Sequence, residues 1–145
     1  MPEPRWDPTE EQFQLAVAQL ARYHGWLVAH FRAARNEGRG KRWRTPVQFD
    51  AAGFPDLVLV RGAEIIFAEL KRNGGRLQAN QAMWLGRLGA VARAVAELAD
   101  RAGDGEGPRP AVEACVWRPR DWELIEARLA RPREAEPPFQ EVVAA

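Results

Sequence analysis

Residues 53–71 read GFPDLVLVRGAEIIFAELK, and this stretch decides the fold. Two apolar runs, 56–61 and 64–70, are separated by the dipeptide Gly62-Ala63. A two-residue connection that begins with glycine is typical of a type II′ hairpin turn. The sequence therefore predicts an antiparallel β-hairpin in which Arg61 faces Glu64.

The same register predicts which residues meet at the open end of the hairpin. Counting back from the turn places Asp56 opposite Glu69, and directly opposed residues have Cβ atoms about 4.5–5.5 Å apart on one face of the sheet. Lys71 lies two residues beyond Glu69, so its side chain points to the same face. The sequence thus predicts a patch of two carboxylates and one ammonium group.

This patch suits a divalent metal. Two carboxylates so close repel each other unless a positive charge lies between them. Mg²⁺ or Mn²⁺ prefers oxygen ligands of this kind, and the carbonyl of Leu70 could supply a further oxygen. Such a metal lowers the pKa of its bound water and polarises a phosphoryl oxygen. With Asp56 and Glu69 as ligands, Lys71 could orient or deprotonate the water, or stabilise charge on the phosphate, so the patch suits phosphodiester hydrolysis.

The alternative is a surface hairpin in which Lys71 merely forms an ion pair with Asp56 or Glu69. Two features argue against it. The residues just before Glu69 are apolar, which places its polar end against a core, and the lead-in Gly53-Phe54-Pro55 makes a rigid approach to Asp56.

Outward from the hairpin, the sequence predicts an α/β fold in the order α-β-β-β-α-β-α, with a mixed sheet flanked by helices. The first helix is expected to begin with Asp7 as N-cap, Pro8 at the first helical position and Glu10 in a capping box. A strand at 26–31 follows it. Beyond the hairpin we expect a long helix from about 78 to 102, a loop at 103–110, a strand at 111–117 and a last helix opened by Pro119. The apolar stripe of the long helix is predicted to be Trp84, Leu88, Val91, Val95, Leu98 and Ala102.

Composition limits the class of protein. The chain has 145 residues, of which 46% are hydrophobic and 28% charged, enough for one domain with a core. No apolar run approaches the ~20 residues of a membrane span, and the polar N-terminus is unlike a secretory signal. One cysteine, Cys115, cannot form an internal disulfide, and two histidines, His24 and His30, are expected to be structural or at the surface. We expect a cytoplasmic protein without a membrane partner, with a domain at 7–130 and a disordered, acidic, proline-containing tail at 131–145.

Basic residues are concentrated in one segment. The net charge is only +1, but residues 32–44 carry six basic side chains against one acid, Glu37. A basic segment on a near-neutral chain is a local footprint for nucleic acid, and phosphate contacts position a duplex without reading its sequence. The predicted DNA contacts are Arg32, Arg35, Arg39, Lys41, Arg42 and Arg44. The alternative is a solvated basic loop.

The ordered motifs resemble a known nuclease family. Gly53-Phe54-Pro55-Asp56-Leu57, then Glu69-Leu70-Lys71, then Gln81 with Trp84-Leu85 and Leu88, resemble the VRR-NUC branch of the PD-(D/E)XK nucleases. The segment from Trp117 to Trp122 resembles the strand-to-helix segment that follows in phage members. The resemblance covers roughly residues 9–129. Pro-Asp or Glu-x-Lys alone is a weak motif, whereas the ordered set with the glutamine is specific.

The resemblance implies a restriction-endonuclease-like fold and Mg²⁺- or Mn²⁺-dependent DNA cleavage in phage or bacterial replication, recombination or repair. It also implies activity on branched DNA such as a four-way (Holliday) junction, in the bacterial cytoplasm and often as a homodimer. Asp56 and Glu69 match the metal ligands, Lys71 the catalytic lysine and Gln81 the family glutamine. The family also places a glutamate on the first helix, where Glu10 fits best and Glu11 is the fallback.

Three alternatives stay open. The first is an endonuclease of nicking or restriction type with a sequence preference. The second is a non-catalytic DNA-binding module on the same fold, although Asp56, Glu69 and Lys71 are all intact. The third is an interaction protein whose tail, from Pro132 onward, recruits a protein partner.

Overall fold

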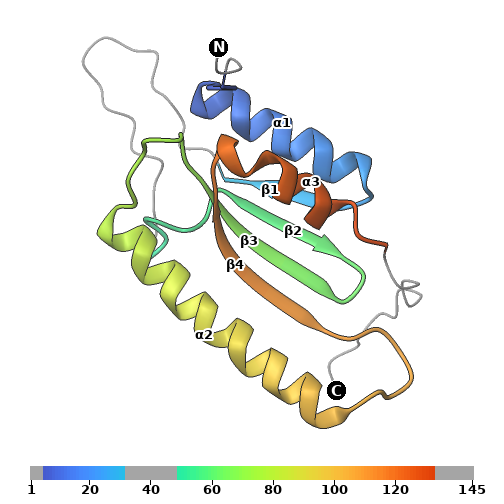
Figure 1. The fold of residues 1–145 in the computed structure, drawn as a ribbon. Helices are drawn as coiled ribbons and strands as arrows, with labels where there is room; N and C mark the ends of the chain where they lie inside the picture. The colour runs from blue at the N-terminus through green and yellow to red at the C-terminus, as the bar shows by residue number, and fades with distance from the viewer. Residues whose placement is uncertain (1–4, 32–48, 133–145) are drawn as a thin grey trace.

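The computed structural model describes residues 5–31 and 49–132, and these form a mixed α/β fold (Figure 1). The predicted order of helices and strands is confirmed, with one added 3₁₀ turn before the last helix. The elements are α1 (Glu10–Tyr23), β1 (Leu27–His30), β2 (Leu57–Arg61), β3 (Glu64–Leu70), α2 (Ala79–Ala102), β4 (Ala111–Trp117), η1 (Pro119–Asp121) and α3 (Trp122–Leu129). The basic segment 32–44 and the tail beyond Pro132 lie outside the described residues.

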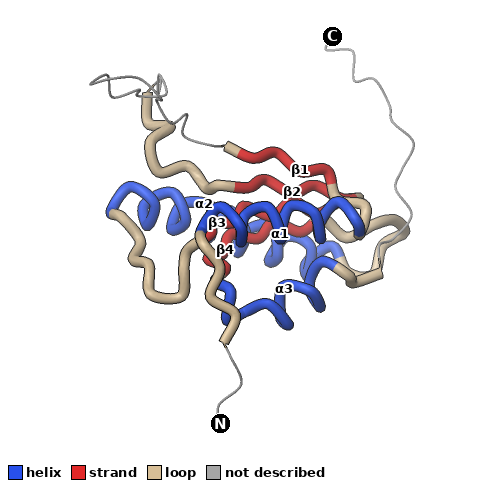
Figure 2. Tube along the Cα trace, turned by 90° about the horizontal axis from the view of Figure 1, so that it is seen from above, coloured by secondary structure: helices blue, strands red, loops and turns tan. Residues whose placement is uncertain are grey.

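The four strands form one mixed sheet in the order β1-β2-β3-β4. β1 and β3 both run antiparallel to β2, and β4 runs parallel to β3. Figures 1 and 2 show α1 and α3 together on one side of the sheet, and α2 along β4 on the other. The coarse prediction of a mixed sheet flanked by helices is therefore confirmed.

The hairpin register is the one that the sequence predicts. Arg61 pairs with Glu64 and Leu57 with Ala68. Gly62 has φ +59°, while Ala63 keeps a negative φ, as a type II′ turn requires. The open end of the hairpin, with Asp56 and Glu69, therefore lies at the opposite end of the sheet from the turn.

Alternation along the strands gives the sheet two different faces. Leu57 and Leu59 of β2, with Ile66, Ala68 and Leu70 of β3, are fully buried against α1 and α3. That core is completed from the helices by Phe13, Val17, Ala21, Ile125 and Leu129. Side chains at 67 and 69 point to the other face, which is the face nearer α2.

The start of α1 differs from the prediction. Its N-cap is Thr9, whose hydroxyl accepts a hydrogen bond from the Gln12 N–H, and the Gln12 side chain accepts from the Thr9 N–H. Asp7 is therefore not the N-cap, and Glu10 is the first helical residue rather than the acid of a capping box. The prediction was wrong because Thr9 and Gln12 offer a second capping box two residues further on.

The buried face of α2 also differs from the predicted stripe. Ala99 is its only fully buried residue, while Val91 and Leu98 are 51% and 63% exposed. The less exposed positions from Trp84 onward are Trp84, Leu85, Leu88, Gly89, Ala92, Val95 and Ala99. In its second half the covered side of the helix therefore follows Ala92, Val95 and Ala99, and the prediction of Val91, Leu98 and Ala102 was wrong.

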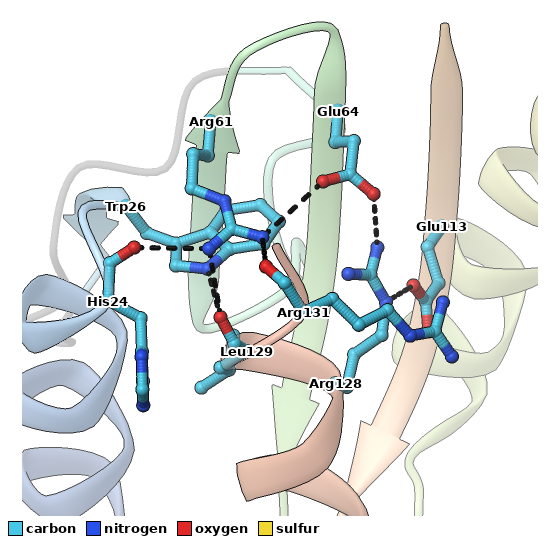
Figure 3. A network of polar contacts seen from close by, with 8 residues as sticks. All are labelled: His24, Trp26, Arg61, Glu64, Glu113, Arg128, Leu129 and Arg131. Carbon is cyan, nitrogen blue, oxygen red and sulfur yellow. Dashed lines mark hydrogen bonds and ion pairs between the residues drawn. The ribbon is translucent and has the colours of Figure 1, made fainter. Parts of the chain in front are cut away.

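Buried arginine contacts join the turn end of the hairpin to α3 (Figure 3). The Arg61 guanidinium donates to the carbonyl oxygens of His24, Leu129 and Arg131 at 2.7–3.1 Å, and lies 4.4 Å from the ring centre of Trp26. Trp26 donates through its indole N–H to the Leu129 carbonyl as well. These bonds satisfy the carbonyl groups at the ends of two helices, so they fix α3 against the hairpin.

No helix among the described residues is long and apolar enough to cross a membrane.

Candidate metal-dependent active site

The candidate site lies where the two hairpin strands open. Asp56 immediately precedes β2, Glu69 is near the end of β3, and Lys71 follows that strand. The Leu70 N–H donates to Asp56 Oδ2 at 2.8 Å, which continues the hairpin contact one step beyond the last backbone pair. Lys71 Nζ lies 3.4 Å from Glu69 Oε1. The two carboxylates and the ammonium group that the register predicts are thus brought together.

Gln81, on α2, forms a hydrogen bond to the patch of Asp56, Glu69 and Lys71. Its side-chain N–H donates to Glu69 Oε1 at 2.7 Å, and its side-chain oxygen accepts from the Gln78 N–H at 2.8 Å. The glutamine therefore caps the start of α2 and fixes one oxygen of Glu69 at the same time.

A close contact between backbones positions that glutamine. Gly53 has φ +84°, and a Cβ atom there would lie 2.6–2.8 Å from atoms of Asn80 and Gln81. The Trp84 indole donates to the Asp50 carbonyl at 2.9 Å, and the Phe54 ring packs edge-on against Trp84. The segment leading to Asp56 is therefore packed directly on the first turns of α2.

Burial and like charge dominate the electrostatics. Glu69 is 1% exposed, and burial, followed by the nearby Asp56 carboxylate, raises the pKa of Glu69 to about 7 against the pull of Lys71. Burial also raises the pKa of Asp56, opposed by the Leu70 N–H, while the Glu10 carboxylate adds to the rise. Each carboxylate makes the other harder to ionise, and a cation between them would reverse this effect.

The residues fit a divalent cation. Among the described residues, Glu69 Oε2 is buried without a hydrogen-bond partner. A buried carboxylate oxygen left in this way is costly unless something positive binds it. No three His, Cys, Asp or Glu side chains in the described ranges are grouped as metal ligands. Asp56 and Glu69 are therefore the side chains that could bind a metal at this site. Mg²⁺ is commonly bound by one or two carboxylates, with water molecules as its other ligands.

Glu10 lies close enough to act on both carboxyl groups through its charge. It is an exposed residue at the start of α1, with its side chain outside the Thr9–Gln12 capping box. Glu10 therefore does not serve in the capping box, which was the alternative to a position near the site. Glu11 is also exposed on the same turn.

Sequence reasoning missed two features at this end of the sheet. His30, expected to be structural or at the surface, is exposed, lies 3.1 Å through Nε2 from Gln14 Oε1, and lowers the pKa of Asp56. Its pairing with Leu57 could have indicated this, since Leu57 is next to Asp56. The second feature is a cleft lined by Arg5, Asp7 and residues 72–75. The run Lys71-Arg72-Asn73-Gly74-Gly75 marks one wall of this cleft in the sequence, but nothing marks the other wall.

Cys115, in β4, is partly buried and packs against the core. Its Sγ lies 3.7 Å from the Phe67 carbonyl oxygen, and burial raises the pKa of the thiol. A thiol held in its neutral form is a poor nucleophile, so this position favours a packing residue.

Comparison with known proteins does not assign the chain to a family. No protein-family model matches the chain, and no curated protein matches it. The nuclease resemblance therefore depends on the motif residues and on their placement.

Proposed function

We propose that the chain is a metal-dependent DNA endonuclease that hydrolyses phosphodiester bonds, with the restriction-endonuclease-like fold of the VRR-NUC nucleases and a preference for branched or four-way-junction DNA. One observation carries the proposal. Asp56 and Glu69 face each other at one end of the hairpin, with Lys71 Nζ 3.4 Å from Glu69 and an unpartnered Glu69 oxygen among the described residues.

Each residue has a distinct part in this proposal. Asp56 and Glu69 would hold Mg²⁺ or Mn²⁺, and the Leu70 carbonyl could join them because the N–H and C=O of a strand residue point to the same side. When bound, such an ion lowers the pKa of water and polarises a phosphoryl oxygen. Glu10 contributes negative charge at the edge of the site.

Lys71 and Gln81 act on the site directly. The Lys71 ammonium balances the Glu69 charge, orients a water and stabilises the charge that grows on the phosphate. Gln81 holds Glu69 Oε1 by its amide N–H, so the carboxylate keeps one orientation. The predicted DNA contacts from Arg32 to Arg44, the homodimer and a partner for the tail remain expectations.

The test is cleavage of a labelled four-way junction beside the matching linear duplex, with Mg²⁺ or Mn²⁺. Asp56→Ala and EDTA are the controls. We expect metal-dependent cutting of the junction that Asp56→Ala abolishes. Equal cutting of both DNAs would contradict the preference for branched DNA but support the nuclease activity. Binding without cutting under either metal would contradict the catalytic proposal and favour a DNA-binding module.

A further inference from the structure

A second polar feature opens at the same end of the sheet. A cleft of about 620 Å³ is lined by Arg5, Asp7, Arg72, Asn73, Gly74 and Gly75. It lies between the segment before α1 and the loop that follows Lys71. Arg72 is the next residue after Lys71, and consecutive Cα atoms lie about 3.8 Å apart. Lys71 is not itself in the lining, and the cleft wall begins one residue after this lysine of the candidate active site.

The loop that forms one wall is held in place from outside. Arg118 donates through one nitrogen to the carbonyl oxygens of Arg72 and Gly75 at 2.7 and 2.6 Å. The Arg120 N–H donates to the Asn73 side-chain oxygen at 2.9 Å. Because the wall is braced at both ends and in the middle, the cleft is a built feature of the fold.

The opposite wall packs on the edge of the core through Trp6, which is itself 44% exposed. The Trp6 carbonyl accepts a hydrogen bond from the Asn73 side chain, and the Trp6 ring packs edge-on against Phe13 and Trp122. This contact holds Arg5 and Asp7, on either side of Trp6, across the cleft from the loop.

The charge of the cleft favours an anion. Within the described residues, neither Arg5 nor Arg72 forms an ion pair, and both side chains are exposed. Asp7 is the one acid in the lining. Exposed, unpaired arginines beside a rigid polar wall can bind phosphate with two parallel hydrogen bonds.

We propose that this cleft binds backbone phosphates of the nucleic-acid strand next to the phosphate held at Lys71. The proposal rests on the proposed function, which supplies the strand. A DNA strand carries one phosphate per about 3.4 Å of helix axis, so a strand positioned at Lys71 brings further phosphates to Arg72 and Arg5. These contacts position the strand without reading its sequence.

The test is the salt dependence of DNA binding, measured by fluorescence anisotropy in EDTA so that no strand is cut. The variants are Arg72→Ala, Arg5→Ala and the charge-preserving Arg72→Lys, with Arg101→Ala at the far end of α2 as the matched control. Each lost phosphate contact should lower the slope of log K against log salt by about 0.9. We expect that loss for both alanine variants, on every DNA sequence tried, and a wild-type slope for Arg72→Lys and Arg101→Ala.

Unchanged slopes in Arg72→Ala and Arg5→Ala would contradict the proposal that the cleft binds phosphates. Titration with inorganic phosphate separates a strand site from a site for a free anion. If phosphate alone bound at micromolar concentration, and Arg72→Ala abolished that binding without changing the DNA slope, the strand proposal would be wrong. If the slope depended on Arg72 but no metal-dependent cutting occurred, the phosphate-binding proposal would stand and the endonuclease proposal would be wrong. If cutting occurred with unchanged slopes, only the phosphate-binding proposal would be wrong.

Discussion

Glu69 is the residue on which the site depends most. It is buried, its Oε1 accepts from Gln81 and lies near Lys71, and its Oε2 has no partner among the described residues. Without a cation, the raised pKa of about 7 means that this carboxyl group stays largely protonated at mildly acidic pH. The same burial that disfavours the charge strengthens any cation contact there.

This pKa predicts how stability depends on pH. Because the folded pKa of Glu69 lies above its ordinary value of 4.5, the folded state holds the proton more tightly. The contribution of Glu69 to the free energy of unfolding should therefore be fully present below pH 4.5 and be lost, by up to about 3 kcal/mol, as pH rises through 7 in EDTA. Glu69→Gln should remove this part of the pH dependence. Urea unfolding at pH 5, 6, 7 and 8 measures it.

Two comparisons sharpen that prediction. Glu97→Gln, an exposed change on α2, should keep the wild-type pH profile. Addition of Mg²⁺ at pH 8 should raise the stability of the wild type and leave Glu69→Gln unchanged, since a ligand that binds only the folded state stabilises it. Identical profiles for wild type and Glu69→Gln in EDTA would contradict the assigned pKa.

Gln81 should matter for metal affinity more than for folding. Gln81→Ala removes the 2.7 Å hydrogen bond to Glu69 Oε1 and frees that carboxylate to rotate. Loss of such a supporting contact typically costs about 10- to 100-fold in metal affinity or activity. The measurement is the Mn²⁺ concentration that gives half-maximal cleavage, with the exposed Met83→Ala as control. A wild-type concentration for Gln81→Ala would rule out a supporting function for this amide.

At the scale of elements, the segment from Asp50 to Pro55 couples the hairpin to α2. Pro55 is buried, the Phe54 ring contacts Phe31, Phe67 and Trp84, and Gly53 touches the backbone of α2. A shift of this segment would move Asp56 and Gln81 together. The segment therefore sets the separation of two site residues that lie 25 positions apart in the sequence.

Gly53→Ala should disturb this packing. The new Cβ would meet backbone atoms of Asn80 and Gln81 at 2.6–2.8 Å, and the left-handed φ disfavours any side chain. We expect a loss of about 1–3 kcal/mol in unfolding free energy together with weaker metal binding. Gly86→Ala, a helical glycine with open space around it, is the matched control and should gain about 0.5–1 kcal/mol. Equal stability of Gly53→Ala and wild type in urea unfolding would show that the contact is looser than described.

The Arg61 contacts form the structural counterpart at the other end of the hairpin. Arg61→Met would leave the part-buried His24 carbonyl without this donor, while the Leu129 carbonyl would keep its hydrogen bond from the Trp26 indole. An unsatisfied buried group costs about 1–3 kcal/mol, so the variant should lose about that much unfolding free energy. Below its unfolding temperature its cleavage rate should stay at the wild-type level, because the site lies at the opposite end of the sheet. A fall in cleavage without a fall in stability would contradict this separation.

At the scale of the whole molecule, the hairpin and its register could be predicted because the Gly62-Ala63 turn and the strand alternation are local signals. The juxtaposition of Asp56, Glu69 and Lys71 followed from that register. The buried face of α2 could not be predicted, since how much of a helix is covered depends on where it lies on the sheet. The Arg5–Arg72 cleft could not be predicted either, because its walls come from residues 67 positions apart.

The two ends of the sheet have different tasks in this protein. At the turn end, the Arg61 guanidinium contacts carbonyl groups, an aromatic ring and the Glu64 carboxylate, so its charge serves stability. At the open end, carboxylates lie with too little positive charge around them, and exposed arginines lie nearby. A buried polar atom without a partner in a native fold needs an explanation, and a bound ion is one of them.

The decisive measurement is Mn²⁺ binding without DNA, by titration calorimetry at pH 8, for the wild type, Glu69→Gln and the control Glu97→Gln. If Asp56 and Glu69 form a cation site, the wild type and Glu97→Gln bind one ion per chain and Glu69→Gln loses that binding. Equal binding by all three proteins, or none by the wild type, would contradict the assignment of these carboxylates as metal ligands.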